Sequence, residues 1–236
     1  MPALPESAVY PLHTPAAHVI RDGAEALAVA RQVAAILLEQ DAERDRTREV
    51  PAQVVDLYSN SGLWGISVPR EFGGAQVSYA VLAEVIAIIS AADPSLGQIP
   101  QNHYCLLEDI RLQGTPEQQA HFFALALQGH RFANALSETG GKNVQDIQAT
   151  IRRSGDGYVI NGRKGYCTGS LYAHWLAVLA LDEQGRGQLA FVPRGSEGLA
   201  VIDDWDSIGQ RTTSSGTVLA QDCLLYTSDA ADDSLR

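Results

Sequence analysis

A small set of amide, hydroxyl, thiol and imidazole side chains could carry chemistry in this sequence. Asn134 and Ser137 lie at the end of the run FANALSE, Cys167 and Thr168 lie in GYCTG, and His103 lies upstream in IPQNHYCLLEDI. Hydroxyl and amide groups at strand ends can donate hydrogen bonds to the polar edge of a cofactor. The alternative at each position is structural: a strand hydroxyl bonded to backbone, a satisfied buried amide or a core histidine.

Several other kinds of site have no sequence signal. The patterns GxGxxG, GxxxxGK[ST], HExxH and CxxC do not occur, so neither a phosphate loop nor a metal site is expected. No motif places a His or Asp partner near Cys167, so a nucleophilic role is not indicated. The three cysteines fit neither a disulfide framework nor paired metal ligands.

Composition narrows the class of protein further. The 236 residues are room for one large or two small domains. The net charge of −11, from 17 basic and 28 acidic residues, argues against binding to nucleic acid or to an anionic membrane. No apolar run approaches the roughly 20 residues that cross a bilayer, and no secretory signal is visible, so a cytoplasmic location is expected.

The pattern of apolar residues over 22–130 predicts a helical domain, which follows an N-terminal extension over 1–21. Apolar residues at helical spacing predict helices over 24–38, 51–60, 79–91, 94–112 and 115–127, and the charged stretch 39–49 is expected to end the first helix in solvent. The helix over 79–91 is apolar almost all round, which is typical of a helix at the centre of a bundle.

From residue 131 the pattern changes to short strands. Seven runs alternate or are rich in β-branched residues: FANALSE, IQATIRR, YVING, HWLAVLAL, LAFVPR, LAVIDDW and TVLAQD. SGDG and NG between them are strong hairpin-turn signals. The sequence therefore predicts an α+β protein, with an N-terminal all-helical domain followed by an antiparallel β-barrel-like domain over 131–222.

Two stretches resemble the acyl-CoA dehydrogenase superfamily. LWGISVPREFGGAQVSYAVLAEVIAIISAADPSLG is similar to its N-terminal helical domain, with a G…PxxxGG loop. NALSETGGKNVQDIQATIRRSGDGYVINGRKGYCTGSLYAHWLAVLAL is similar to its middle β domain, whose usual form is LTEPxxGSD…GYxLNGxKxWITNG. Together they cover about residues 20–222, and the combination is specific.

Three departures from the dehydrogenase pattern indicate a particular branch. Ser137–Glu138–Thr139 replaces Thr-Glu-Pro, Lys142–Asn143–Val144 replaces Gly-Ser-Asp, and Tyr166–Cys167–Thr168 replaces Trp-Ile-Thr. With Asn134 and the run DDWDSIGQRTTSSGTV, these features resemble the monooxygenase-like branch, which includes dibenzothiophene desulfurisation monooxygenases and sulfur-acquisition oxidoreductases. That branch implies an enzyme that uses reduced flavin and oxygen on a small organosulfur substrate.

The resemblance also implies a flavin site. Leu136 and Ser137 match the family's "LT" contact, Tyr166, Cys167 and Thr168 match "WIT", and the Thr168 hydroxyl is expected near flavin N5. Asn134 is expected to face the space between flavin and substrate, and His103 lies on the helix that edges the family's substrate cavity. The expected catalytic residues are therefore Asn134, His103 and Thr168, and the cofactor-binding residues are Leu136, Ser137, Tyr166, Cys167 and Thr168. The cofactor is flavin, with FMN and FAD both open.

The loop run DDWDSIGQRTTSSG carries a less specific signal. Arg211 with Ser214 or Ser215 could contact a cofactor phosphate, because Arg pairs with phosphate through two parallel hydrogen bonds. The commoner explanation is a surface Arg in a polar loop. Trp205 could flank the substrate cavity or plug the end of the barrel.

The end of the sequence departs from the family pattern. CLLYTSDAADD matches the translation of a transposon-end adapter used in sequencing libraries, so residues 223–236 are interpreted as a non-native tail on a truncated gene. A natural flexible terminus is the alternative. The family's C-terminal four-helix domain is then missing, and the chain alone is expected to aggregate or bind flavin poorly. The parent is expected to be a homo-oligomer, a dimer or tetramer.

Two other functions stay open at this point. A true acyl-CoA dehydrogenase would oxidise an acyl-CoA thioester, although the altered Thr-Glu-Pro and Gly-Ser-Asp motifs argue against it. A non-catalytic interaction module would have the same fold without flavin. Flavin absorbance and fluorescence separate that module from both enzymes.

Overall fold

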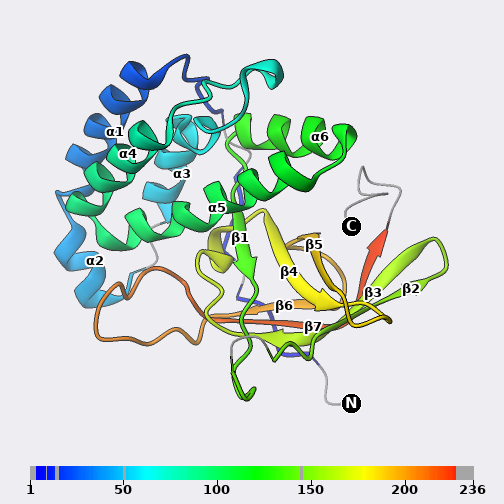
Figure 1. The fold of residues 1–236 in the computed structure, drawn as a ribbon. Coiled ribbons are helices and arrows are strands. Elements are labelled where there is room, and N and C mark those ends of the chain that lie inside the picture. Colours follow the sequence, from blue (N-terminus) through cyan, green and yellow to red (C-terminus); the bar gives the residue numbers. More distant parts are fainter. Residues whose placement is uncertain (1–3, 9, 14–15, 50–51, 144–145, 227–236) are drawn as a thin grey trace.

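The helices and strands form two layers that meet along α5 and β1 (Figure 1). The computed structural model describes residues 4–8, 10–13, 16–49, 52–143 and 146–226. These residues form six α-helices and seven strands, with the helices first in the chain and the strands after them. The predicted α+β class is confirmed.

Capping residues explain where most of the helices begin. The Asp22, Ser78 and Asp93 side chains each accept a backbone N–H of the first turn of the helix that follows. Thr115 and Gln118 form a reciprocal capping box ahead of Pro116. The helices are α1 (Gly23–Leu37), α2 (Asp41–Thr47), α3 (Ala52–Asn60), α4 (Tyr79–Ala92), α5 (Pro94–Gln113) and α6 (Pro116–Leu127). Within the described residues, none of the helices is both long enough and apolar enough to cross a bilayer.

The charged stretch 39–49 does not simply end the first helix in solvent, because α2 forms within it. The reason is a buried guanidinium. Arg44 donates to Asp93 Oδ2 from Nε at 3.2 Å and from Nη2 at 2.8 Å, and Nη2 also donates to the Leu37 carbonyl at 2.6 Å. These bonds dock α2 against the end of α1 and the start of α5.

The centre of the helical layer is α5 and not α4, which corrects the prediction for 79–91. Only Val85, Ile89 and Ala92 of α4 are buried, whereas ten residues of α5 are. Small residues let α5 approach its neighbours closely: a Cβ on Gly97 would lie 2.0 Å from the Ser90 hydroxyl. Closeness of approach, more than apolar content, decides which helix is central here.

The strands form one curled sheet of mixed direction. Its order is β1-β4-β2-β3-β7-β6, with β5 paired to β4. Most pairs are antiparallel as expected, but β4 runs parallel to β1 and to β2. The strands are β1 (Phe132–Ala135), β2 (Thr150–Ser154), β3 (Gly157–Lys164), β4 (Trp175–Leu181), β5 (Gly187–Pro193), β6 (Leu199–Ile202) and β7 (Thr217–Tyr226). Each of the seven predicted runs overlaps one of them, and β2, β3, β5 and β7 extend beyond the predicted runs.

Both ends of the described chain lie against this sheet. The Ala8 amide donates to the Val201 carbonyl at 2.9 Å, so the N-terminal extension runs beside β6. Strand β7 continues past Asp222, and Cys223 and Leu225 are buried. The adapter origin of residues 223–236 stays a prediction, and residues 227–236 lie outside the described residues.

The first prediction concerns Asp93, which caps α5 and pairs with buried Arg44. Asp93→Ala leaves that guanidinium uncompensated, so we expect a loss of about 3–5 kcal/mol in the free energy of unfolding. Urea denaturation measures it. Asp22→Ala is the matched control, because it removes an exposed cap worth about 1 kcal/mol. Equal losses in the two variants would contradict a structural role for the buried pair.

Candidate functional site

The end of β1 lies beside the segment that follows β3. The Gly165 amide donates to the Ser137 carbonyl at 2.9 Å, and Asn134 Nδ2 donates to the Tyr166 carbonyl at 3.4 Å. Two segments about thirty positions apart in sequence are thereby held in register. The structure thus brings together the two groups of residues that the sequence proposed as a site.

A buried ion pair stands behind this junction. Lys164 Nζ donates to Glu138 Oε1 at 2.6 Å and to the Leu136 carbonyl at 3.2 Å. Burial alone would raise the pKa of Glu138, but the hydrogen bonds from Lys164 and from the amides of Ala149 and Gln148 lower it overall. Glu138 is therefore held as a carboxylate. Sequence reasoning gave this pair no role, although both residues stand in the motifs that carried the family resemblance.

Asn134 presents an acceptor that has no partner. The residue is 8% exposed, and its Oδ1 is buried without a hydrogen bond among the described residues. The amide orientation is set by the Tyr166 carbonyl, which needs a donor and so turns Nδ2 toward itself. A buried acceptor without a donor costs about 1–3 kcal/mol, so this atom calls for a donor from a ligand or a water molecule.

Tyr166 and Cys167 point in opposite directions. The Tyr166 side chain is 61% exposed, its backbone has φ of +55°, and its ring meets Trp205 edge-on at 6.2 Å. A bulky residue in the left-handed region is strained, and such strain gathers at functional sites. Trp205 therefore flanks Tyr166 in this structure.

Cys167 does not offer a group to a cofactor. Its side chain is completely buried, and burial raises the pKa of the thiol to about 12. Its amide donates to the Gly216 carbonyl at 3.0 Å, and its carbonyl accepts from the Ser170 amide at 3.1 Å. The prediction that Cys167 binds flavin is therefore not supported, because the segment after β3 turns this side chain inward.

Thr168 begins a line of buried hydroxyl groups. Its Oγ1 lies 2.8 Å from Ser215 Oγ, which lies 2.8 Å from Thr213 Oγ1. Thr213 Oγ1 donates onward to the Gln210 carbonyl at 3.1 Å. Sequence reasoning considered Thr168 and Ser215 separately and missed Thr213. The hydroxyl-rich run TTSSG was the available signal.

The loop between β6 and β7 does not offer a phosphate site of the kind considered above. Arg211 donates from Nη1 to the Asp45 and Arg46 carbonyls, at 3.4 and 3.1 Å, and so holds the loop against α2. Ser214 Oγ accepts from the Leu171 amide at 2.9 Å. Arg211 and Ser214 thus hold the loop in place through these bonds.

His103 ties the helical layer to β1. It is completely buried, with Nε2 donating to the Trp64 carbonyl at 2.9 Å and Nδ1 accepting from the Phe132 amide at 3.1 Å. Burial lowers the pKa of His103 to about 3, so the ring is neutral. With both nitrogens engaged, His103 does not face a substrate in this structure, which argues against direct catalytic contact.

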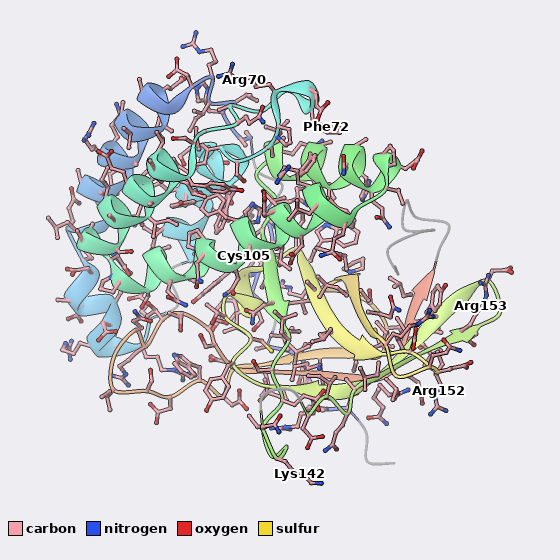
Figure 2. All side chains as sticks on the ribbon, in the orientation of Figure 1. Arg70, Phe72, Cys105, Lys142, Arg152 and Arg153 are labelled. Carbon is pink, nitrogen blue, oxygen red and sulfur yellow. The ribbon has the colours of Figure 1, made fainter. Side chains whose placement is uncertain are left out.

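Leu136 and Ser137 are half-buried at the open side of the junction. Among the described residues, the Ser137 hydroxyl has no hydrogen-bond partner, so it is free to meet a ligand. Directly after it, a hollow of about 260 Å³ opens beside Glu138, Thr139 and Gly140. Figure 2 shows Lys142 at the outer tip of the same loop, pointing away from the body of the protein.

Comparison with known families decides what this arrangement belongs to. Residues 20–130 match the N-terminal domain of acyl-CoA dehydrogenases, and residues 133–223 match the middle domain. The chain belongs to the acyl-CoA dehydrogenase family. The predicted resemblance is confirmed, and the two matches meet where the helices give way to β1.

Several relatives of this family member are monooxygenases. It is 34% identical over 207 residues to a dibenzothiophene monooxygenase of Rhodococcus erythropolis, covering 84% of the chain and 49% of that relative. It is 30% identical over 195 residues to the probable FMNH2-dependent monooxygenase SfnC of Pseudomonas putida, covering 81% and 48%.

Among solved structures, FMN-bound TdsC from Paenibacillus sp. A11-2 matches with a TM-score of 0.80 and 33% identity, covering 85% of the chain and 52% of TdsC. The chain spans about half the length of these relatives.

The second prediction concerns the pH dependence that His103 confers. The pKa of His103 is about 3 in the folded protein and about 6.5 in the unfolded chain, so the unfolded chain binds the extra proton between these values. The free energy of unfolding therefore decreases as the pH is lowered below about 6.5. Between pH 7 and pH 5 the wild type should lose about 2 kcal/mol more than His103→Gln, whose side chain does not titrate. Urea unfolding at each pH measures both. Parallel curves would contradict a neutral, buried His103.

Proposed function

We propose that this chain forms the helical and β domains of a flavin-dependent monooxygenase. The enzyme would use reduced flavin and oxygen to oxidise a small organosulfur compound. The relatives of this chain, which include the probable FMNH2-dependent monooxygenase SfnC and FMN-bound TdsC, favour FMN as the flavin. The observation that carries the proposal is the junction of β1 with residues 164–168, where Asn134 bonds to the Tyr166 carbonyl and keeps a buried acceptor without a donor among the described residues.

The residues present fit a flavin at this junction. Asn134 Oδ1 is buried and lacks a donor among the described residues, and Ser137 is half-buried at the open side of the junction. A flavin ring carries both donors and acceptors along its polar edge, so it can satisfy these groups together. Leu136, Ser137, Tyr166 and Thr168 would hold the ring, while the buried Cys167 side chain would anchor the segment that carries Tyr166 and Thr168.

Each of these residues has a separate task in the proposed reaction. Bound reduced flavin supplies the electrons that activate oxygen. Asn134 would accept a hydrogen bond from the bound ligand through Oδ1, and Thr168 would hold the flavin edge. Tyr166 and Trp205, in edge-on contact, would help to exclude water from the face beside them.

His103 would act through β1 and not on the substrate. Its Nδ1 accepts the amide of Phe132, two positions before Asn134, and its ring stacks on Phe132 at a centroid distance of 5.1 Å. We therefore assign it as a positioning residue in this proposal. It fixes the height of β1 relative to the helical layer.

The remaining expectations belong to the same proposal. The substrate would be a small molecule, and the whole protein would be a homo-oligomer, a dimer or tetramer, in the cytoplasm. Light scattering after size-exclusion chromatography tests the oligomer. In this proposal the sheet supplies one wall of the site.

The third prediction tests the function. The protein is mixed with reduced FMN, oxygen and one of two sulfur compounds, and the oxygenated product is measured by mass spectrometry. The compounds are dibenzothiophene and methanesulfinate, after which two similar monooxygenases are named. Asn134→Ala should lower the rate by roughly a hundredfold, the scale for removing one preorganised hydrogen-bonding group. Asn161→Ala is the matched control, because that amide bonds to Asp222 away from the site and should leave the rate near that of the wild type.

Two results would overturn the proposed function. Oxidation of an acyl-CoA thioester without oxygenation of either sulfur compound would indicate a dehydrogenase. Failure of the whole protein to bind reduced or oxidised FMN would indicate a non-catalytic module. Equal rates for Asn134→Ala and the control would remove Asn134 from the site while leaving the reaction class intact.

A further inference from the structure

The line of hydroxyl groups behind Thr168 has only one consistent order of protons. It ends on the Gln210 carbonyl, which can only accept. Thr213 therefore spends its single proton on Gln210. The contact of 2.8 Å between Ser215 and Thr213 then needs the proton of Ser215, and the contact of 2.8 Å between Thr168 and Ser215 needs the proton of Thr168.

The far end of this line is well anchored. The Gln210 carbonyl also accepts from the Trp205 indole at 3.1 Å and from the Thr213 amide at 3.3 Å. Thr168, Thr213 and Ser215 are all at least nine-tenths buried, so water does not readily compete for these hydroxyls. Hydrogen bonds in such a chain polarise one another, which strengthens the preference for a single order.

We propose that this relay, Thr168–Ser215–Thr213–Gln210, makes Thr168 an acceptor toward the bound flavin and so selects the reduced cofactor. The proposal rests on the proposed function, which places flavin beside Thr168. Reduced flavin carries a hydrogen on N5 and can donate it to Thr168. Oxidised flavin presents a lone pair at N5, which meets the lone pairs of the Thr168 oxygen and is disfavoured.

Asn134 provides a second hydrogen-bond acceptor in the site. Asn134 Oδ1 is an acceptor without a donor, and Asn134 Nδ2 is spent on the Tyr166 carbonyl. Two acceptors on adjacent segments therefore demand donors from the same ligand. Ser215 and Thr213 are positioning residues, since they act only through the hydroxyl of Thr168.

The fourth prediction follows from breaking the relay at a distance. In Thr213→Val, Ser215 loses its acceptor and turns its proton to Thr168, which frees the Thr168 proton to donate to oxidised flavin. Ser215→Ala frees it directly. Each variant should lower the ratio of the dissociation constants for oxidised and reduced FMN by about tenfold, the scale of one net hydrogen bond. For a two-electron couple this equals a fall of about 30 mV in the midpoint potential of the bound flavin.

The measurement uses the whole protein that contains this chain. Oxidised FMN is titrated in air and dithionite-reduced FMN without oxygen, and circular dichroism checks the fold of each variant. Thr213→Ser keeps the hydroxyl and should restore the wild-type ratio. Thr217→Val is the matched control, because it removes a buried threonine hydroxyl that bonds to Asp204 outside the relay, so the ratio should not change. An unchanged ratio in both Thr213→Val and Ser215→Ala would overturn the proposal.

A measurement without cofactor separates this proposal from the proposed function. If the wild type binds neither form of FMN, the proposed function fails, and with it the selection of the reduced cofactor. The relay itself is then judged by a double-mutant cycle of Thr168→Val and Thr213→Val in urea unfolding. A common chain through Ser215 predicts a coupling of about threefold or more in the unfolding equilibrium constant. Additive effects would show that the fixed proton order does not exist.

Discussion

The site depends on burying the Lys164 ammonium group where β1 ends. Lys164 is 1% exposed, and its bonds to Glu138 and to the Leu136 carbonyl fix the path of the chain after Ala135. An ammonium group that deep in the protein is stable only if it is paired and hydrogen-bonded. The same two bonds that satisfy it place Ser137 beside Gly165. The bonds that compensate the buried charge of Lys164 therefore also build the site.

The helical layer contributes by holding β1 from its other end. Arg131 donates to the Asp56 carboxylate at 3.0 Å, to the Ser59 hydroxyl at 2.8 Å and to the Tyr172 carbonyl at 2.6 Å. With the His103 contact to Phe132, these bonds connect α3, α5 and the turn before β4 to the start of one short strand. Arg131 and Phe132 therefore tie the start of β1 to the helical layer.

Much of the fold could be predicted from the sequence because its signals are local. Alternation along the seven strand runs and the caps of α1, α4, α5 and α6 are visible in windows of a few residues. The centre of the helical layer was not predictable in this way, because Gly97, Ser95 and Pro100 of α5 are not strongly apolar. Their burial depends on how closely the neighbouring elements approach, which apolar periodicity does not report.

The candidate site, like the fold, could be predicted from the sequence only in part. The residue types and the two segments followed from the motifs, but the inward turn of Cys167 and the relay partners of Thr168 did not. Those depend on where a loop more than thirty residues away lies. Gln210 and Ser214 shape that loop by adopting the left-handed region, at φ of +52° each. Neither residue type predicts this backbone conformation.

The parallel pairing of β1 with β4 has a consequence for how the protein matures. Residue 132 meets residue 175, and Thr168 meets Ser215, so no single stretch of chain contains the junction. Contacts of such long sequence separation form late, after the loops between them have closed. The nascent polypeptide therefore has no place for a cofactor until the sheet has curled. A ligand that binds only the finished arrangement would then pull the folding equilibrium toward it by mass action.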